Sequence, residues 1–174
     1  NLVGKENDGW TVAKYLLEFE RGGSAAPGLE VGIQKVRALA SKEQTGTGSN
    51  LMEDSNFAAK LSALEIDIQA LEFTEHRILS AMNAGQNPGP ASSMLKTKAT
   101  ELRQQVDEIA VEAIQYYAAP DQMSARQTGS NVAPIGPAEA LTAVPAYLNN
   151  RAGSIYGGSN EVQRNIMAKL VLGL

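Results

Sequence analysis

The sequence predicts an all-α protein, an up-down helical bundle of the four-helix type that contains one long helical hairpin. Apolar residues recur at intervals of three and four along two long stretches, which is the period of a helix. The strict alternation that is typical of β-strands is almost absent. The 174 residues, 43% of them hydrophobic, correspond in size to one domain and suffice for a hydrophobic core.

The hairpin is expected to pair a helix over about residues 57–82 with one over about 95–116. Glu75 occupies the one heptad position of the first helix that is not apolar. The apolar positions of the first helix are Phe57, Leu61, Leu64, Ile68, Leu71, Ile78 and Met82, and those of the second are Leu95, Ala99, Leu102, Val106, Ile109, Ala113 and Tyr116. Residues 85–90, Gly-Gln-Asn-Pro-Gly-Pro, cannot continue a helix, because Pro lacks a backbone donor and Gly and Asn favour turns. The charged residues on the polar faces are expected to be solvated, namely Glu65, Asp67, Glu72, Lys96, Lys98 and Glu101.

Two helices are predicted before the hairpin. Asp8 is a candidate N-cap for the first, which ends near Glu20-Arg21-Gly22-Gly23. Its apolar face is Trp10, Ala13, Leu16 and Leu17. The second runs from about Leu29 to Lys42, with Pro27 marking a kink between the two rather than a true break.

The remaining segments divide into loops and two further helices. Residues 45–50 and 119–137 are rich in Gly, Pro and polar residues and are predicted to lack regular structure. Helices are expected over about 138–150, where Pro145 warns of irregularity, and after Ser159.

Composition excludes several classes of function. The 15 Lys and Arg against 19 Asp and Glu give a formal charge of −4, which disfavours nucleic-acid binding. The absence of Cys and the single His exclude disulfides, thiolate zinc sites and His-rich metal centres. No apolar run approaches the roughly 18 residues that span a bilayer, and no signal-peptide pattern opens the chain. A soluble, cytoplasmic protein without a metal, nucleic-acid or membrane partner is therefore expected.

The first candidate site is the segment from Ser154 to Asn165. Its Gly157-Gly158 pair follows an apolar and an aromatic residue and precedes Ser159, a candidate cap for the next helix. A helix start offers backbone N–H groups to a ligand, and the missing Cβ of glycine permits close contact. A tight turn with a good cap is the alternative, and composition alone favours it.

The second candidate site is the pair Glu20-Arg21. Continuing the stripe of Trp10, Ala13 and Leu17 by three or four residues reaches this pair, so charges stand on an apolar helix face. Desolvation there would raise the proton affinity of a carboxylate, which suits a general base, although Arg21 would oppose this effect. An ion pair at a frayed helix end is the alternative, and spacing alone favours it.

A resemblance to a known family covers essentially the whole chain. Residues Ile155 to Ala168, with the closing Leu172-Gly173-Leu174, resemble the C-terminal signature of flavin-dependent acyl-CoA dehydrogenases. The opening Asn1 to Trp10, which lacks an initial Met, resembles the passage from that family's middle β-domain into its C-terminal helical domain. The resemblance implies a fragment, with a linker remnant in residues 1–7 and the helical domain in residues 8–174. Within the family the chain looks most like bacterial large-subunit members such as pimeloyl-CoA dehydrogenase.

The resemblance also implies a reaction. In this family, whose members act in fatty acid metabolism, a carboxylate removes the pro-R α-proton of an acyl-CoA thioester. A β-hydride passes to N5 of FAD, the product is a trans-2-enoyl-CoA, and the electrons leave to an electron-transferring flavoprotein. The fragment alone is expected to have little or no activity, because the other domains enclose substrate and flavin in the family.

The roles of the family's site residues can be assigned to the positions of this sequence that match the family's motifs. The backbone N–H after the motif's Tyr, here that of Gly157, stabilises the enolate on the thioester oxygen. Many members carry the catalytic Glu at this position, but a minority carries it on the first helix of the domain before an Arg, which Glu20-Arg21 matches. The resemblance thus implies Glu20 as the base, with Arg21 and Tyr156 near the substrate. It implies flavin contacts at Gly158, Ser159 and Glu161.

Two family features that reach a neighbouring subunit's flavin are missing. No Arg-x-x-Phe-Gly motif occurs around residues 34–44, and residues 115–119, Gln-Tyr-Tyr-Ala-Ala, replace a glycine-rich turn. These departures are compatible with a heteromer in which a second subunit completes the adenine end. Since the family assembles through this domain, a homo-oligomer or a heteromer is expected. The alternative function is a non-catalytic helical assembly subunit, in which Gly157 marks lost chemistry.

Overall fold

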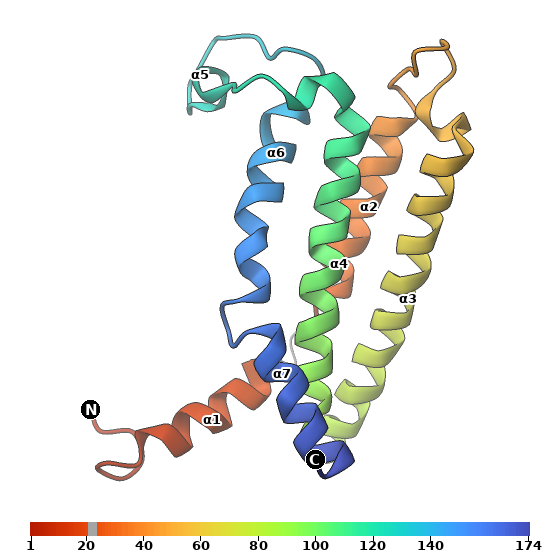
Figure 1. The fold of residues 1–174 in the computed structure, drawn as a ribbon. Helices are drawn as coiled ribbons and strands as arrows, with labels where there is room; N and C mark the ends of the chain where they lie inside the picture. The colour runs from red at the N-terminus through yellow and green to blue at the C-terminus, as the bar shows by residue number, and fades with distance from the viewer. Residues whose placement is uncertain (21–23) are drawn as a thin grey trace.

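A computed structural model of the chain is built from helices (Figure 1). It describes residues 1–20 and 24–174, without the side chains of residues 18–20. The α-helices are α1 (Gly9–Glu20), α2 (Ala26–Ala40), α3 (Ser55–Asn83), α4 (Ala91–Ile114), α5 (Met123–Arg126), α6 (Ala140–Asn149) and α7 (Asn160–Met167). Within the described residues there is no β-strand, only an isolated antiparallel bridge between Gln44 and Asn50. The predicted all-α class is confirmed.

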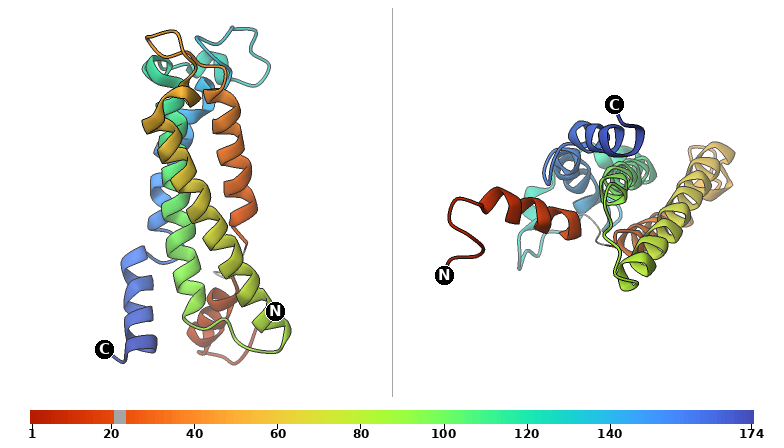
Figure 2. Two further views of the ribbon diagram at one scale, coloured as in Figure 1. Left: turned by 90° about the vertical axis from the view of Figure 1, so that its right-hand side faces the viewer. Right: turned by 90° about the horizontal axis from the view of Figure 1, so that it is seen from below.

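Four of the helices form the bundle. α2 rises, α3 descends, α4 rises and α6 descends, with α4 in contact with each of the other three (Figures 1 and 2). α3 and α4 are joined at residues 84–90 as the predicted antiparallel hairpin. α7 crosses the lower part of α4 and ends in a π-helical turn, Ala168–Leu172. No helix in the described part of the chain is both long and apolar enough to cross a membrane.

The core follows the predicted stripes closely. On α3 every predicted apolar position from Phe57 to Ile78 is buried, and Met82 packs against them half-buried. On α4 the stripe holds from Leu95 to Ala113. The prediction for Tyr116 is wrong, because its side chain is 92% exposed. The α-helix ends at Ile114, which is buried instead, and Gln115 turns the chain with a φ of 51°.

Ser24 and Ala25, just before α2, are not helical, so the predicted kink at Pro27 is wrong. α1 ends at Glu20 and α2 begins at Ala26, with Pro27 in its first turn. Proline is tolerated there because the N–H groups of the first turn have no intrahelical partner. The start of α2 has no cap from its own side chains. Glu75 of α3, which is only 2% exposed, accepts hydrogen bonds from Ser24, Ala25 and Ala26 instead.

α1 projects away from the bundle (Figures 1 and 2). Trp10 is 72% exposed and Leu16 62%, whereas Ala13 and Leu17 are half-buried. The predicted apolar face of α1 is therefore not buried at Trp10 and Leu16. No described element of the chain lies over them.

The long loop of residues 119–137 is ordered by a few specific contacts. The side chain of Gln122 bonds to both backbone groups of Ile135, accepting its N–H at 2.7 Å and donating to its carbonyl at 3.2 Å. Gly136, with a φ of 82°, lies under the ring of Tyr117 so closely that a Cβ there would stand 2.4 Å from ring carbons. The prediction of an irregular connection holds except for the single turn of α5.

Candidate functional site

The Gly157-Gly158 turn connects the 3₁₀ segment Asn150–Ser154 to α7. Both glycines are left-handed, with φ values of 67° and 91°, a conformation that L side chains rarely adopt. Ser159 then caps α7, because its hydroxyl accepts the N–H of Val162 at 3.4 Å. The predicted glycine turn and serine cap are thus both present.

The turn is open on its outer side. A Cβ at Gly157 would meet no atom within 4 Å, and Ile155 and Tyr156 are 68% and 64% exposed. The hydroxyl of Tyr156 lies back over Gly153, where a Cβ would be 3.7 Å from it. The space that a Cβ at Gly157 would enter is therefore empty of other parts of the chain.

Polar side chains along one face of α4 form hydrogen bonds with the segments before and after the Gly157-Gly158 turn. Asn160, the buried first residue of α7, accepts a hydrogen bond from Lys96 at 2.9 Å and pairs with the hydroxyl of Thr100 at 3.2 Å. One helical turn further on, Gln104 donates to the carbonyl of Asn150 at 3.1 Å. Asp107, a turn beyond, accepts from the side chain of Asn150 at 2.7 Å.

Arg151 attaches the segment before the turn to α4 and α6. Its guanidinium donates to the carbonyl of Gln104 at 3.0 Å and to that of Tyr147 at 3.1 Å, and it stacks 4.3 Å from the centre of the Tyr147 ring. Lys96 was predicted to be solvated, and this prediction is wrong, because its ammonium group donates a hydrogen bond to Asn160. The sequence showed Lys96 only as a charge on a polar helix face, and its partner is 64 residues away.

The start of α7 favours negative charge. The pKa of Glu161 lies below its usual value, because the carboxylate accepts hydrogen bonds from its own backbone N–H and from the Ser159 hydroxyl. Arg164 and Lys96 lower it further by their positive charge. Arg164 also pairs with Glu101 of α4, which ties the exposed face of α7 to the bundle. Ser159 and Glu161, predicted as flavin contacts, thus share one hydrogen-bonded helix start.

The second candidate site is placed only through its backbone. Glu20 is the last residue of α1, and Arg21 lies outside the described residues. Figures 1 and 2 place α1 at the same end of the bundle as α7 and the α3–α4 turn. The two predicted site segments, which are far apart in the sequence, therefore share one end of the fold.

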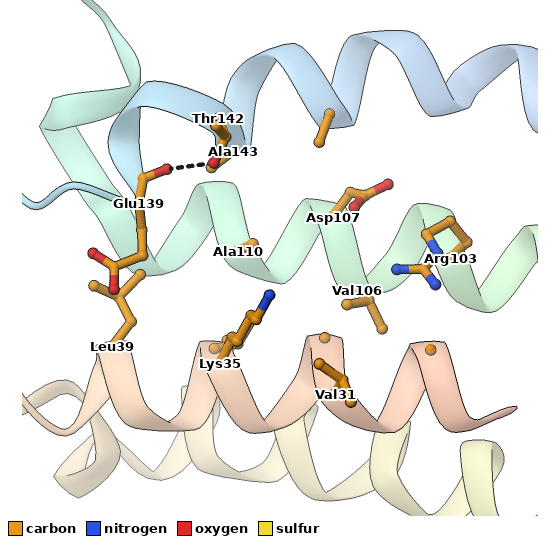
Figure 3. Close-up of a pocket in the computed structure, with 14 residues that line it drawn as sticks. Val31, Lys35, Leu39, Arg103, Val106, Asp107, Ala110, Glu139, Thr142 and Ala143 are labelled. Atoms are coloured by element: carbon orange, nitrogen blue, oxygen red, sulfur yellow. Dashed lines mark hydrogen bonds between the residues drawn. The ribbon is translucent and has the colours of Figure 1, made fainter. Parts of the chain in front are cut away.

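A groove of about 280 Å³ between α2, α4 and α6 was not predicted (Figure 3). Lys35 of α2 and Arg103 of α4 line it together with Asp107 and with Glu139, just before α6. Small residues on α2 make it possible, because a Cβ at Gly28 would lie 3.2 Å from the Arg103 guanidinium. None of the predicted site residues whose side chains the structure describes lines this groove. Among the described residues there is also no group of three or more acidic, His or Cys side chains that could hold a metal.

Comparison with known proteins identifies the family. The family model described as acyl-CoA dehydrogenase, C-terminal domain, matches residues 7–172. The chain is 30% identical over 173 residues to the acyl-CoA dehydrogenase IpdE1 of Mycolicibacterium smegmatis, covering 99% of this chain and 38% of that protein. It therefore spans well under half the length of this curated relative.

Solved structures share the fold. The ChsE4-ChsE5 complex from Mycobacterium tuberculosis matches 99% of this chain and 42% of its own with a TM-score of 0.74 and 24% identity. The FAD complex of PigA matches 99% of this chain and 40% of its own with a TM-score of 0.77 and 18% identity. At these identities the structures establish the fold alone. Fold and sequence together show that the chain belongs to the acyl-CoA dehydrogenase family and corresponds to its C-terminal domain.

Proposed function

We propose that this chain is the C-terminal domain of a longer FAD-dependent enzyme that oxidises an acyl-CoA thioester to a trans-2-enoyl-CoA. The observation that carries the proposal is the open glycine turn at Gly157, next to a capped helix start, in a chain that matches this family over residues 7–172. Residues 1–7 are then the linker from a preceding domain, and residues 8–174 form the helical domain.

The proposed chemistry divides between two segments of the chain. Glu20 at the end of α1 removes the α-proton, and the backbone N–H of Gly157 stabilises the negative charge that develops on the thioester oxygen. Arg21 and Tyr156 contact the substrate. Because Gly157 carries no carboxylate, a base from another segment is required, and Glu20 matches the family pattern for one.

The residues around the turn fit one edge of a flavin ring. A Cβ at Gly157 would meet no atom within 4 Å, and neither Gly157 nor Gly158 carries a side chain that would stand in the way of a flat group. Ser159 and Glu161 stand at the adjoining helix start. Bound FAD supplies the acceptor for the β-hydride, while the residues of this chain orient the thioester and take its proton.

A heteromeric enzyme that delivers electrons to an electron-transferring flavoprotein is the proposed assembly. The family's flavin motif is absent around residues 34–44, and residues 115–119, where glycines were expected, contain the 3₁₀ turn Gln115–Ala118. A second subunit would supply these contacts. The ChsE4-ChsE5 complex, a solved assembly of two named components, shares the fold and supports this proposal. The alternative assembly is a homo-oligomer.

The second candidate function is a non-catalytic assembly subunit. The specific observation in its favour is Gly157, which stands where many family members carry their catalytic Glu. In that case the turn and α7 serve only to pack the domain against other subunits.

The test uses the full-length protein, co-purified with any partner subunit. We expect a bound yellow flavin that a matching acyl-CoA bleaches in the wild type but not in Glu20→Gln, while Glu18→Gln on the same helix behaves as the wild type. Bleaching at the wild-type rate in Glu20→Gln would assign the base to another residue. A colourless protein that ignores every acyl-CoA tested would establish the assembly subunit. Mass measurement of the same preparation distinguishes a heteromer from a homo-oligomer.

A further inference from the structure

Glu75 is a buried carboxylate in the apolar seam of α3. It stands between Leu71 and Ile78, which are both in the core, and it is 2% exposed. A buried carboxylate needs hydrogen-bond donors to remain ionised without a large desolvation cost. Among the described residues, the donors to Glu75 all lie just before and at the start of α2.

Three consecutive residues supply these donors. The hydroxyl of Ser24 donates to Oε2 at 2.8 Å, and the N–H of Ala25 donates to Oε1 at 2.7 Å. The N–H of Ala26 is shared between the two oxygens at 3.2 and 3.3 Å. These N–H groups stand at the start of α2, where the helix dipole also favours a negative charge. Glu75 therefore caps α2 from a different helix, about 50 residues away in the sequence.

The junction is also the covalent path from α1 into the bundle. Glu20 lies four residues before Ser24, so the chain cannot carry it more than roughly 14 Å from that anchor. Trp10 and Leu16 on the apolar face of α1 do not hold the helix against the described part of this chain, because both are mostly exposed. Among the described residues, Ser24, Ala25 and Ala26 form the anchor that lies nearest to the end of α1.

We propose that Glu75 is a positioning residue, which clamps Ser24 to Ala26 and thereby fixes where α1 presents Glu20. This inference rests on the proposed function for the role of Glu20. It assigns no contact between Glu75 and the substrate or the flavin. Its effect on the reaction comes only through the geometry of α1.

The first test measures that geometry directly in the full-length protein. Spin labels at Lys14→Cys on α1 and Gln105→Cys on α4 report the distance between the two helices, since both residues are exposed and this segment has no native Cys. With native Glu75 we expect one narrow distance distribution. Glu75→Leu should broaden or shift it, and Ser24→Ala should do so less. Glu75→Gln, which keeps one acceptor oxygen, should remain close to the native distribution.

The matched control is Glu72→Gln, three residues earlier on α3, where the side chain is about half exposed. It should leave the distance unchanged. If Glu75→Leu does not fold, as judged by circular dichroism, Ser24→Ala decides the outcome. A native distribution in every folded Glu75 and Ser24 variant would overturn the proposal.

The second test separates positioning from general stability. In single-turnover bleaching by an acyl-CoA, Glu75→Leu should lower the rate between about tenfold and about a hundredfold, with flavin content and substrate affinity unchanged. Glu75→Gln should recover most of the rate. A changed distance with an unchanged rate, or the reverse, would contradict the proposal.

The two proposals fail in different ways. Bleaching at the wild-type rate in Glu20→Gln refutes the assignment of the base and, with it, the part of Glu75 in the reaction. The spin-label distances still decide whether Glu75 holds α1. Conversely, unchanged distances refute the role of Glu75 and leave the assignment of Glu20 standing.

Discussion

Lys96 of α4 donates a hydrogen bond of 2.9 Å to the side-chain oxygen of Asn160, the first residue of α7. Asn160 is 2% exposed and also pairs with the Thr100 hydroxyl at 3.2 Å. This contact fixes the start of α7 on the bundle, immediately after the Gly157-Gly158 turn. The position of the candidate site therefore depends on a polar contact between residues more than 60 positions apart.

Replacing Asn160 with Ala tests this attachment. The change leaves the Lys96 ammonium and the Thr100 hydroxyl without their shared partner in a half-buried place, so the free energy of unfolding should fall by about 1 to 3 kcal/mol. Chemical denaturation followed by circular dichroism measures it. Asn165→Ala, an exposed position on the same helix, should change stability little. Equal effects at both positions would contradict the attachment.

Gly136→Ala tests the packing of the long loop. A Cβ there would stand 2.4 Å from the Tyr117 ring, and φ at this position is 82°. Backbone strain and overpacking together should lower the free energy of unfolding by about 2 to 5 kcal/mol. Gly129→Ala is the matched control, with a φ of 78° but no atom within 4 Å of the new Cβ. It carries the strain alone and should cost about 1 to 2 kcal/mol.

The double variant Gly136→Ala with Tyr117→Ala completes this test. Removing the ring opens the space that the new Cβ needs, so the double variant should lose less stability than the two single losses added together. Strict additivity would show that the ring does not press on residue 136.

The pKa of Glu161 provides a test by titration. Hydrogen bonds from its own N–H and from Ser159 stabilise the ionised carboxylate in the folded protein, so its pKa lies below the usual 4.5. Such a group contributes stability above pH 4.5, and this contribution is lost as the pH falls through the lower folded pKa. A nuclear magnetic resonance titration of the Glu161 carboxyl carbon should give a midpoint below 4.5, and Ser159→Ala should raise that midpoint. A midpoint at or above 4.5 in the native protein would contradict the structure.

The hairpin could be predicted because its information is local. The spacing from Phe57 to Ile78 and from Leu95 to Ala113 places each apolar side chain on one helix face, and the structure buries that face. The Gly157 turn and the Ser159 cap were predictable for the same reason. Tyr116 was mispredicted because the helix ends at Ile114, and the backbone of Gln115 decides this end rather than an apolar pattern.

The long-range polar contacts could not be predicted. Glu75 looked like a gap in an apolar stripe, whereas its carboxylate caps a helix about 50 residues earlier. Lys96 looked like a solvated charge, whereas it bonds to the start of α7. Pairings of this kind depend on which helix ends meet in space, and periodicity carries no information about that. On α1 the error was the opposite, because an apolar helix face was predicted and its Trp10 and Leu16 are exposed. An amphipathic pattern identifies the apolar face of a helix but not the surface that covers this face.

Moving the carboxylate from residue 20 to residue 157 tests whether Glu20 is the base. In the full-length enzyme, the rate of flavin bleaching by an acyl-CoA should fall by at least about a hundredfold in Glu20→Gln. Gly157→Glu introduces a carboxylate at a position with open space, although its φ of 67° strains any side chain. In the double variant Glu20→Gln with Gly157→Glu, we predict at least about a tenfold recovery over Glu20→Gln alone. An unaffected rate in Glu20→Gln, or no recovery in a folded, flavin-loaded double variant, would contradict the account.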